Sequence, residues 1–326
     1  MATTVIKTVK SSGGDYSSRS ALEAAIPANL VTADEIWIGE TYSFSDTTAL
    51  VIDGHVTDAT RYIELRAPAG ERHARVWDTA KSYMSVASDR AITISDACVR
   101  ISGQQLTHSS QSDSLHELIF INATDNGANG SDIRVFNNIL KGGGNNANFE
   151  SGISVYNARG TVRIWNNFIY NLGYGGANYP GIRFDTYDSN YAWNNTIYGK
   201  TGSTSRYGIY NAYSANPPSI GGNICNNNAT DYSGTLTSLG YNISQDATSP
   251  DTSLRSKTVA FVSTTGGSED FGLLVSDTAA KDTGADTSSG FFIDDIEYVT
   301  RAGTWDIGAS EYVAAGSDVL NSQILM

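Results

Sequence analysis

The sequence predicts an all-β solenoid, in which the chain winds into stacked coils. One unit occurs twice between Gly152 and Thr201: a Gly-Ile strand, a turn, and a second strand with a central Asn-Asn pair. Asparagines recur at intervals of 29, 28 and 28 residues and Gly-Ile pairs at 29 and 27, so two sets of positions keep nearly one period. The segments between turns lack the length and periodicity of a crossover helix. Each strand must therefore pair in parallel with its own copy in the next coil.

The first 45 residues are expected to form a strand and a cap. Val5 to Val9 reads as a β-strand. Ser20-Ala21-Leu22-Glu23 has the form of a capping box and leads into a short helix that ends near Pro27. Such a helix covers the open end of a solenoid's apolar core.

The coils are assigned to residues 46–260, irregular at first and regular from about residue 131 to Ile224. Around the first coils, short apolar segments typical of strands are Glu35–Ile38, Ala49–Ile52, Tyr62–Arg66, Ala91–Ile94, Val99–Ile101 and Leu118–Asn122. An insertion from Arg66 to Lys81 interrupts them, and insertions in a solenoid often build surface sites. Asn242 follows Asn223 by only 19 residues, so the last coils are expected to be shorter.

Alignment of the coils puts one side-chain amide at the same position of each coil. The members of this column are Gln104, Asn138, Asn167, Asn195 and Asn223. Stacked about 4.8 Å apart, such amides bond to one another and form a structural ladder inside the solenoid. Strict alternation along the strand would turn them outward, so the strand must bend just before them.

Two further columns lie beside the ladder and are expected to face outward. They are the aromatic residues Phe136, Trp165 and Trp193, and the arginines Arg100, Arg134 and Arg163. An exposed stripe of this kind suits an acidic sugar chain, through ring stacking and charge-assisted hydrogen bonds. It equally suits a subunit interface, or an aromatic ladder partly covered by loops.

Residues 261–313 form a closing segment with two recognisable elements. Ala280 to Gly284 reads Ala-x-Asp-x-Gly, and Asp306 to Tyr312 reads Asp-Ile-Gly-Ala-x-Glu-Tyr. With the opening Thr8 to Tyr16, these elements resemble the right-handed parallel β-helix repeat proteins of bacteria and bacteriophages. The resemblance spans almost the whole chain and implies the fold. That group includes lyases, hydrolases, epimerases, adhesins and phage spikes or capsid decorations, so the resemblance does not select a function.

The resemblance also frames the search for a catalytic site. Lyases of this fold class use acidic residues with Ca²⁺ and a base, and hydrolases use paired carboxylates. The best local cluster is Arg183, Asp185 and Asp188, with Lys200 and Arg206 one coil away. Aspartates that flank a turn are common for backbone reasons alone, and no acidic column repeats from coil to coil. We therefore predict no catalytic residue, with this cluster as the only candidate.

No cofactor or metal site is predicted from residue spacing. The histidines are scattered, and the candidates for a Ca²⁺ site in the closing segment are Asp282, Asp286, Asp294 and Asp295. Turn and capping roles explain these aspartates as well. Cys98 and Cys225 lie far apart and are expected to be small buried apolar residues rather than a disulfide.

Composition limits the classes of partner that the chain is expected to bind. The chain has 326 residues and a net charge of -13, which argues against nucleic acid or an anionic membrane as the main partner. The start lacks the apolar core of a signal peptide, and no segment approaches transmembrane length. The tail, residues 314–326, is flexible at first and then apolar, at Val319, Leu320, Ile324, Leu325 and Met326. Such a tail can add to another chain's sheet or groove.

These features predict a non-enzymatic structural or adhesive protein: a component of a phage virion surface, either a capsid decoration or a tail or spike protein. Resemblance to phage β-helices implies a homo-oligomer, a trimer, with other virion proteins as partners and a surface polysaccharide as a possible ligand. One alternative is a lyase or hydrolase that acts on an acidic polysaccharide. The other is a carbohydrate-binding module without turnover. If a leader has been removed, the location is instead secreted or cell-surface.

Overall fold

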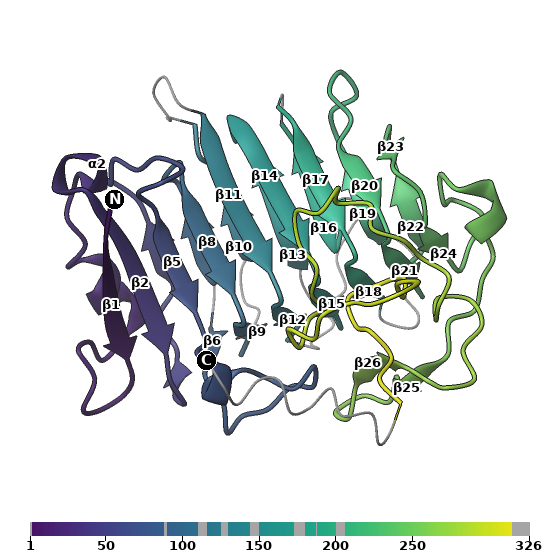
Figure 1. Cartoon of the computed structure of the whole chain (residues 1–326), viewed down its shortest axis with the longest axis horizontal. Helices are drawn as coiled ribbons and strands as arrows, with labels where there is room; N and C mark the ends of the chain where they lie inside the picture. The colour runs from purple at the N-terminus through teal and green to yellow at the C-terminus, as the bar shows by residue number, and fades with distance from the viewer. Residues whose placement is uncertain are drawn as a thin grey trace.

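The computed structural model describes residues 2–87, 90–109, 116–124, 130–143, 150–172, 180–186, 188–199 and 206–314. Within these ranges the chain forms a parallel β-helix, as the sequence predicts. Its coils stack along the long axis from the N-terminus to β24 (Figure 1). Each regular coil supplies one strand to each of three parallel sheets, called here sheets 1, 2 and 3 in chain order.

The strands of each sheet follow one another as the coils do. Sheet 1 contains β1 (Thr3–Val9), β2 (Glu35–Thr41), β5 (Ile63–Arg66), β8 (Val99–Ser102), β11 (Ser131–Phe136), β14 (Gly160–Trp165), β17 (Asn190–Trp193), β20 (Ser219–Gly221) and β23 (Thr237–Ser238). Sheet 2 contains β3 (Ser45–Asp46), β6 (Tyr83–Val86), β9 (Gln105–His108), β12 (Ile139–Lys141), β15 (Phe168–Tyr170), β18 (Thr196–Tyr198), β21 (Ile224–Asn226) and β24 (Ile243–Ser244). Sheet 3 contains β4 (Leu50–Ile52), β7 (Ile92–Ile94), β10 (His116–Ile121), β13 (Glu150–Tyr156), β16 (Ile182–Asp185), β19 (Tyr207–Asn211) and β22 (Thr230–Ser233).

The strand register confirms the predicted alignment of coils. In sheet 1 Arg134 pairs with Arg163, and in sheet 3 Ile153 pairs with Ile182. Alternate Ile and Val residues point inward and form one fully buried apolar core. The glycine before the inward Ile recurs for a steric reason. A Cβ built on Gly152 would lie 2.5 Å from the backbone oxygen of Gly181 in the next coil.

The strand bends as predicted, at one residue before each ladder amide. Asn137, Asn166 and Asn194 have positive φ angles of 55°, 52° and 48°. This left-handed conformation suits Asn better than most residues, because its short side chain bonds locally. It turns the chain from sheet 1 into sheet 2 and swings the following amide into the interior.

The N-terminal end of the core is covered by two short helices, α1 (Arg19–Glu23) and α2 (Leu30–Ala33). Leu22 and Leu30 are buried beneath them. The predicted capping residue is wrong: Ser18, not Ser20, accepts the hydrogen bond from the Ala21 N–H. Ser20 instead donates its hydroxyl to the Ala49 carbonyl, so the helix begins two residues earlier. Two 3-10 turns, Ala69–Glu71 and Thr252–Leu254, complete the described helical elements.

The C-terminal part forms a second layer on the outside of the solenoid. The last coil strand ends at Ser244, before the predicted boundary at residue 260. An antiparallel hairpin, β25 (Phe261–Ser263) and β26 (Asp270–Leu273), follows, and the chain then runs back along the coils (Figure 1). Side chains of this layer, such as Phe271 and Ile307, pack with Phe168 of sheet 2 in a second apolar cluster.

Candidate functional site

The predicted amide ladder is present and lies entirely inside the solenoid. The Nδ2 of Asn138 donates to Oδ1 of Asn167 at 3.0 Å, and the same contact joins Asn167 to Asn195 at 2.9 Å and Asn195 to Asn223 at 3.0 Å. Each Oδ1 also accepts the backbone N–H of the preceding member. Gln104 joins through its backbone N–H, which donates to Asn138. The column is therefore a structural element, without free groups for a ligand.

The ladder extends beyond the predicted members at both ends. Asn223 donates to Asn242, which in turn donates to the carboxylate of Asp251 at 3.0 Å. At the other end Gln104 Oε1 accepts from the guanidinium of Arg19, whose side chain is fully buried. Burial lowers the pKa of Arg19 to about 10, which leaves it charged at neutral pH.

The aromatic column does face outward, but the prediction of an exposed stripe is wrong. The exposed fractions are 5% for Trp165 and 4% for Trp193, because the C-terminal segment covers them. Trp165 stacks on Phe136, with ring centroids 4.2 Å apart, and packs against Phe291 and Phe292. The covered aromatic ladder, one of the three interpretations of the sequence, describes this column.

The arginine column is half-buried and already engaged. Arg134 and Arg163 both bind Asp132, with shortest distances of 2.6 Å each. The guanidinium of Arg100 lies 3.3 Å from the ring centroid of Tyr62, and burial lowers its pKa. Phe291 also covers the guanidinium groups of Arg134 and Arg163. Arg134 and Arg163 therefore attach the second layer to sheet 1 and do not form an exposed binding surface.

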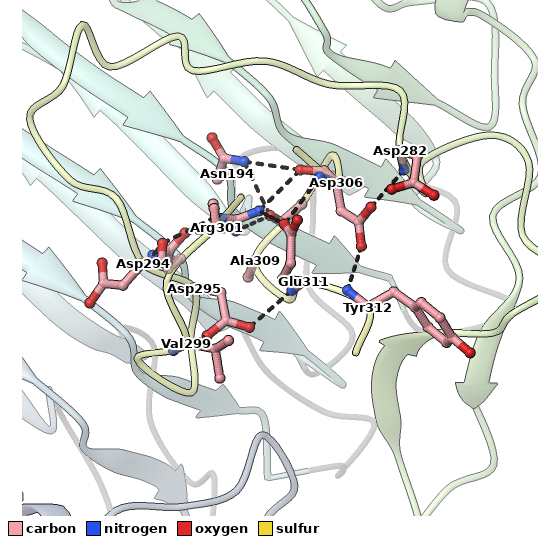
Figure 2. Close-up of polar contacts among 12 residues, drawn as sticks. Asn194, Asp282, Asp294, Asp295, Val299, Arg301, Asp306, Ala309, Glu311 and Tyr312 are labelled. Atoms are coloured by element: carbon pink, nitrogen blue, oxygen red, sulfur yellow. Dashed lines mark hydrogen bonds and ion pairs between the residues drawn. The ribbon is translucent and has the colours of Figure 1, made fainter. Parts of the chain in front are cut away.

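The left-handed asparagines at the bend bind the C-terminal segment. Nδ2 of Asn137 donates to the Asp295 carbonyl at 3.0 Å, and Nδ2 of Asn166 donates to the Asp294 carbonyl at 2.8 Å. Asn194 reaches the carbonyl groups of Asp306 and Gly308 (Figure 2). Each Asn-Asn pair thus has two roles: its first amide holds the outer layer and its second builds the ladder. Sequence reasoning missed the first role, although the doublets signalled it.

Arg301 is the centre of the closing segment (Figure 2). Its buried guanidinium donates to Glu311 Oε2 at 2.9 Å, to Asn166 Oδ1 at 3.2 Å and to the Gly308 carbonyl at 2.8 Å. Burial raises the pKa of Glu311 to about 7 against the attraction of Arg301, and raises that of Asp294 to about 6. These perturbed carboxylates belong to a contact between layers, so their shifts do not indicate catalysis.

The motif Asp306 to Tyr312 attaches the closing segment to the solenoid. The Asp306 carboxylate accepts the backbone N–H groups of Asp282 and Tyr312, and the Gly308 N–H donates to the Gly222 carbonyl of the solenoid. Asp295 accepts N–H groups of Glu297, Val299 and Glu311. Asp286 accepts from Ser288 and Gly290 in its own turn. The described residues contain no group of three or more His, Cys, Asp or Glu side chains that could hold a metal ion.

The candidate catalytic residues do not share one role. Arg183 and Asp185 form an ion pair at 2.8 Å on the outer face of β16. The Asp188 carboxylate instead accepts the Gly160 N–H at 2.8 Å and fixes a turn of the neighbouring coil. Arg206 is buried and donates to the Leu172 carbonyl, and Lys200 lies outside the described residues.

A pocket of about 160 Å³ opens on the outer face of sheet 3 beside Arg183. Its lining residues are Arg90, Glu117, Phe120, Ser154, Tyr156 and Arg183. Sequence reasoning included only Arg183. Two of the others, Ser154 and Tyr156, were detectable in principle, because they alternate with the inward Ile153 and Val155 in the repeat.

Cys98 and Cys225 are free and buried, as predicted. The apolar tail at Val319, Leu320, Ile324, Leu325 and Met326 lies outside the described residues. In the part of the chain that the structure covers, no helix is long and apolar enough to span a bilayer.

Comparison with known proteins adds no relative. The chain matches no protein-family model, no curated protein and no solved structure.

Proposed function

We propose that this chain is a non-enzymatic structural and adhesive β-helix protein of a virion surface, as a capsid decoration or as a tail or spike protein. The observation that carries the non-enzymatic part is the use of its buried charged groups. Arg19, Arg301, Asp295 and Asp306 all bind backbone or ladder groups that hold the fold together. Buried charged side chains that bind the protein's own backbone stabilise the fold. This use favours a rigid structural role.

The double-layered architecture supports a structural role. The C-terminal segment covers the aromatic column of sheet 1 and much of the outer face of sheet 2. Side chains such as Tyr156, in contrast, remain exposed on sheet 3. The resemblance of the Asp306 to Tyr312 element to phage and bacterial β-helix proteins supports the virion location. A homotrimer and contacts with a capsid or tail protein are part of this proposal.

The test is the copy number of this chain in purified particles from its source, by quantitative mass spectrometry. Hundreds of copies per particle are expected of a capsid decoration, and a few to some tens of a tail or spike protein. Absence from particles would contradict the virion role. Light scattering of the purified chain checks the trimer, which a stable monomer at high concentration would exclude.

A carbohydrate-binding role without turnover is the second candidate, and the pocket beside Tyr156 favours it. Binding and cleavage are separated by one experiment. The chain is incubated with a panel of polysaccharides, with and without Ca²⁺, and products are measured by reducing-end assay and by absorbance of unsaturated sugars. No cleavage is expected. Turnover that disappears in Asp185→Ala would establish the enzyme alternative instead.

A further inference from the structure

We infer that the pocket on the outer face of sheet 3 is a subsite for a neutral saccharide. This inference rests on the adhesive role proposed above and assigns it to a place and a ligand class. The sequence alone pointed elsewhere, to sheet 1 and to an acidic sugar chain. Among the residues that the structure describes, the C-terminal segment covers that stripe, and this pocket stays open.

The pocket lies where one small residue stands between two large ones on neighbouring strands. Phe120, Ser154 and Arg183 occupy equivalent outward positions on β10, β13 and β16. Neighbouring strands lie about 4.8 Å apart, so the short side chain of Ser154 leaves a gap between a ring and a guanidinium. The gap has an aromatic ring on one side and a guanidinium on the other, two groups that bind sugars.

An aromatic surface borders this gap. Tyr156 has an exposed fraction of 42%, and its ring stacks near that of Phe120 at a centroid distance of 6.1 Å and an angle of 26°. The Arg90 guanidinium lies 3.3 Å from the Phe120 ring centroid and holds that ring in place. A half-exposed ring with a polar edge offers an apolar platform and a hydroxyl at once, which suits the mixed surface of a pyranose.

The charges of the pocket select a neutral ligand. Arg90 binds Glu117 at 3.0 Å, and Arg183 binds Asp185 at 2.8 Å, so each cation already has a carboxylate partner. The carboxylate of an acidic sugar placed beside these cations would also lie near Glu117 and Asp185, and the like charges would repel. A sugar hydroxyl, in contrast, accepts from a guanidinium and donates to a carboxylate in the same place, and keeps both ion pairs.

The experiment uses the purified full-length chain on an array of neutral oligosaccharides, made of glucose, galactose, mannose or N-acetylglucosamine, beside oligogalacturonates. The best ligand is then measured by titration calorimetry. Neutral oligosaccharides are expected to bind, and oligogalacturonates to bind more weakly. Tighter binding of the oligogalacturonates, or no binding at millimolar concentration, would overturn the inference.

Two variants locate the site. Ser154→Tyr places a large ring between Phe120 and Arg183 and fills the gap, so it is expected to abolish binding. Tyr156→Ala removes the platform and is expected to weaken binding by about tenfold. Tyr241→Ala is the matched control, because Tyr241 has a similar exposed fraction of 38% and is not among the residues that line the pocket. Thermal melting confirms folding of each variant, and unchanged affinity in Ser154→Tyr would contradict the assignment.

The result is separable from that of the proposed function. Saccharide binding by a chain absent from particles would leave the pocket assigned and remove the virion role. Presence in particles without saccharide binding by the chain would support the virion role and remove the pocket assignment.

Discussion

Arg19 and Asp251 close opposite ends of one buried column of amides. Arg19 donates to Gln104 at 3.1 Å, and Asp251 accepts from Asn242 at 3.0 Å. The asparagines between them turn Oδ1 toward the arginine end and Nδ2 toward the aspartate end. A cation thus meets the oxygen end of the column and an anion meets the nitrogen end. The two charges thus complement the polarity of the column at each end.

Asn167→Ala tests the ladder at its centre. The change removes Oδ1 of Asn167, so the buried backbone N–H of Asn138 loses its acceptor. Asn138 Nδ2 and Asn195 Oδ1 lose one hydrogen bond each. An unpaired buried N–H costs about 1–3 kcal/mol and a lost hydrogen bond about 1 kcal/mol, so we expect the free energy of unfolding to fall by about 3 kcal/mol in urea denaturation. Ser11→Ala, at an exposed turn, is the control and should change stability by less than about 0.5 kcal/mol. Equal stability of both variants would show that the ladder contributes little.

Arg19→Met tests the charged end of the column. Asp46, whose side chain is buried, loses its cation, and such a loss typically costs about 3–5 kcal/mol. The double variant with Asp46→Asn removes the unpaired charge, so we expect it to recover a large part of the loss. A double variant as unstable as the sum of both single variants would mean that the ion pair itself is unimportant.

Asn166→Gly tests the attachment of the outer layer without straining the bend. Glycine keeps the positive φ and loses the amide that binds Asp294 and Arg301. We expect faster hydrogen exchange in residues 285–312 and a red shift of tryptophan emission, while exchange in the solenoid core stays slow. Asn157→Gly is the control, at another left-handed position with a φ of 49°, which follows β13 of sheet 3 and lies outside the bend between sheets 1 and 2. Identical exchange in both variants would refute the attachment.

The raised pKa values of the carboxylates around Arg301 predict that the fold is more stable at mildly acidic pH than at neutral pH. The pKa of Glu311 is raised from 4.5 to about 7 and that of Asp294 from 3.8 to about 6, mainly by burial. Between these ordinary and raised values the folded chain keeps protons that the unfolded chain has released. Stability therefore falls as pH rises through this window. Urea unfolding from pH 4.5 to 8 should show the fall, and Glu311→Gln should reduce its slope. A wild-type stability that rises with pH would contradict the assignment.

Several features of this protein follow from the sequence alone, because they repeat. A column of Asn-Asn pairs and a column of Gly-Ile pairs share one period, and parallel stacking converts that period into register. The ladder at Asn138, Asn167, Asn195 and Asn223, the core and the need for a bend are local consequences of that register. The same regularity also predicted which residues of sheet 1 face outward.

What covers an outward face was decided only by the tertiary structure. Phe291 and Phe292 lie far from Trp165 in the sequence and belong to no repeat, so no period predicts that they cover it. The pocket depends likewise on Phe120, Ser154 and Arg183 from three different coils, and on Arg90 covering one of them. Repeats determine position along and around the solenoid. Contacts with non-repeating segments decide which surface stays open, because they depend on the path of the whole chain.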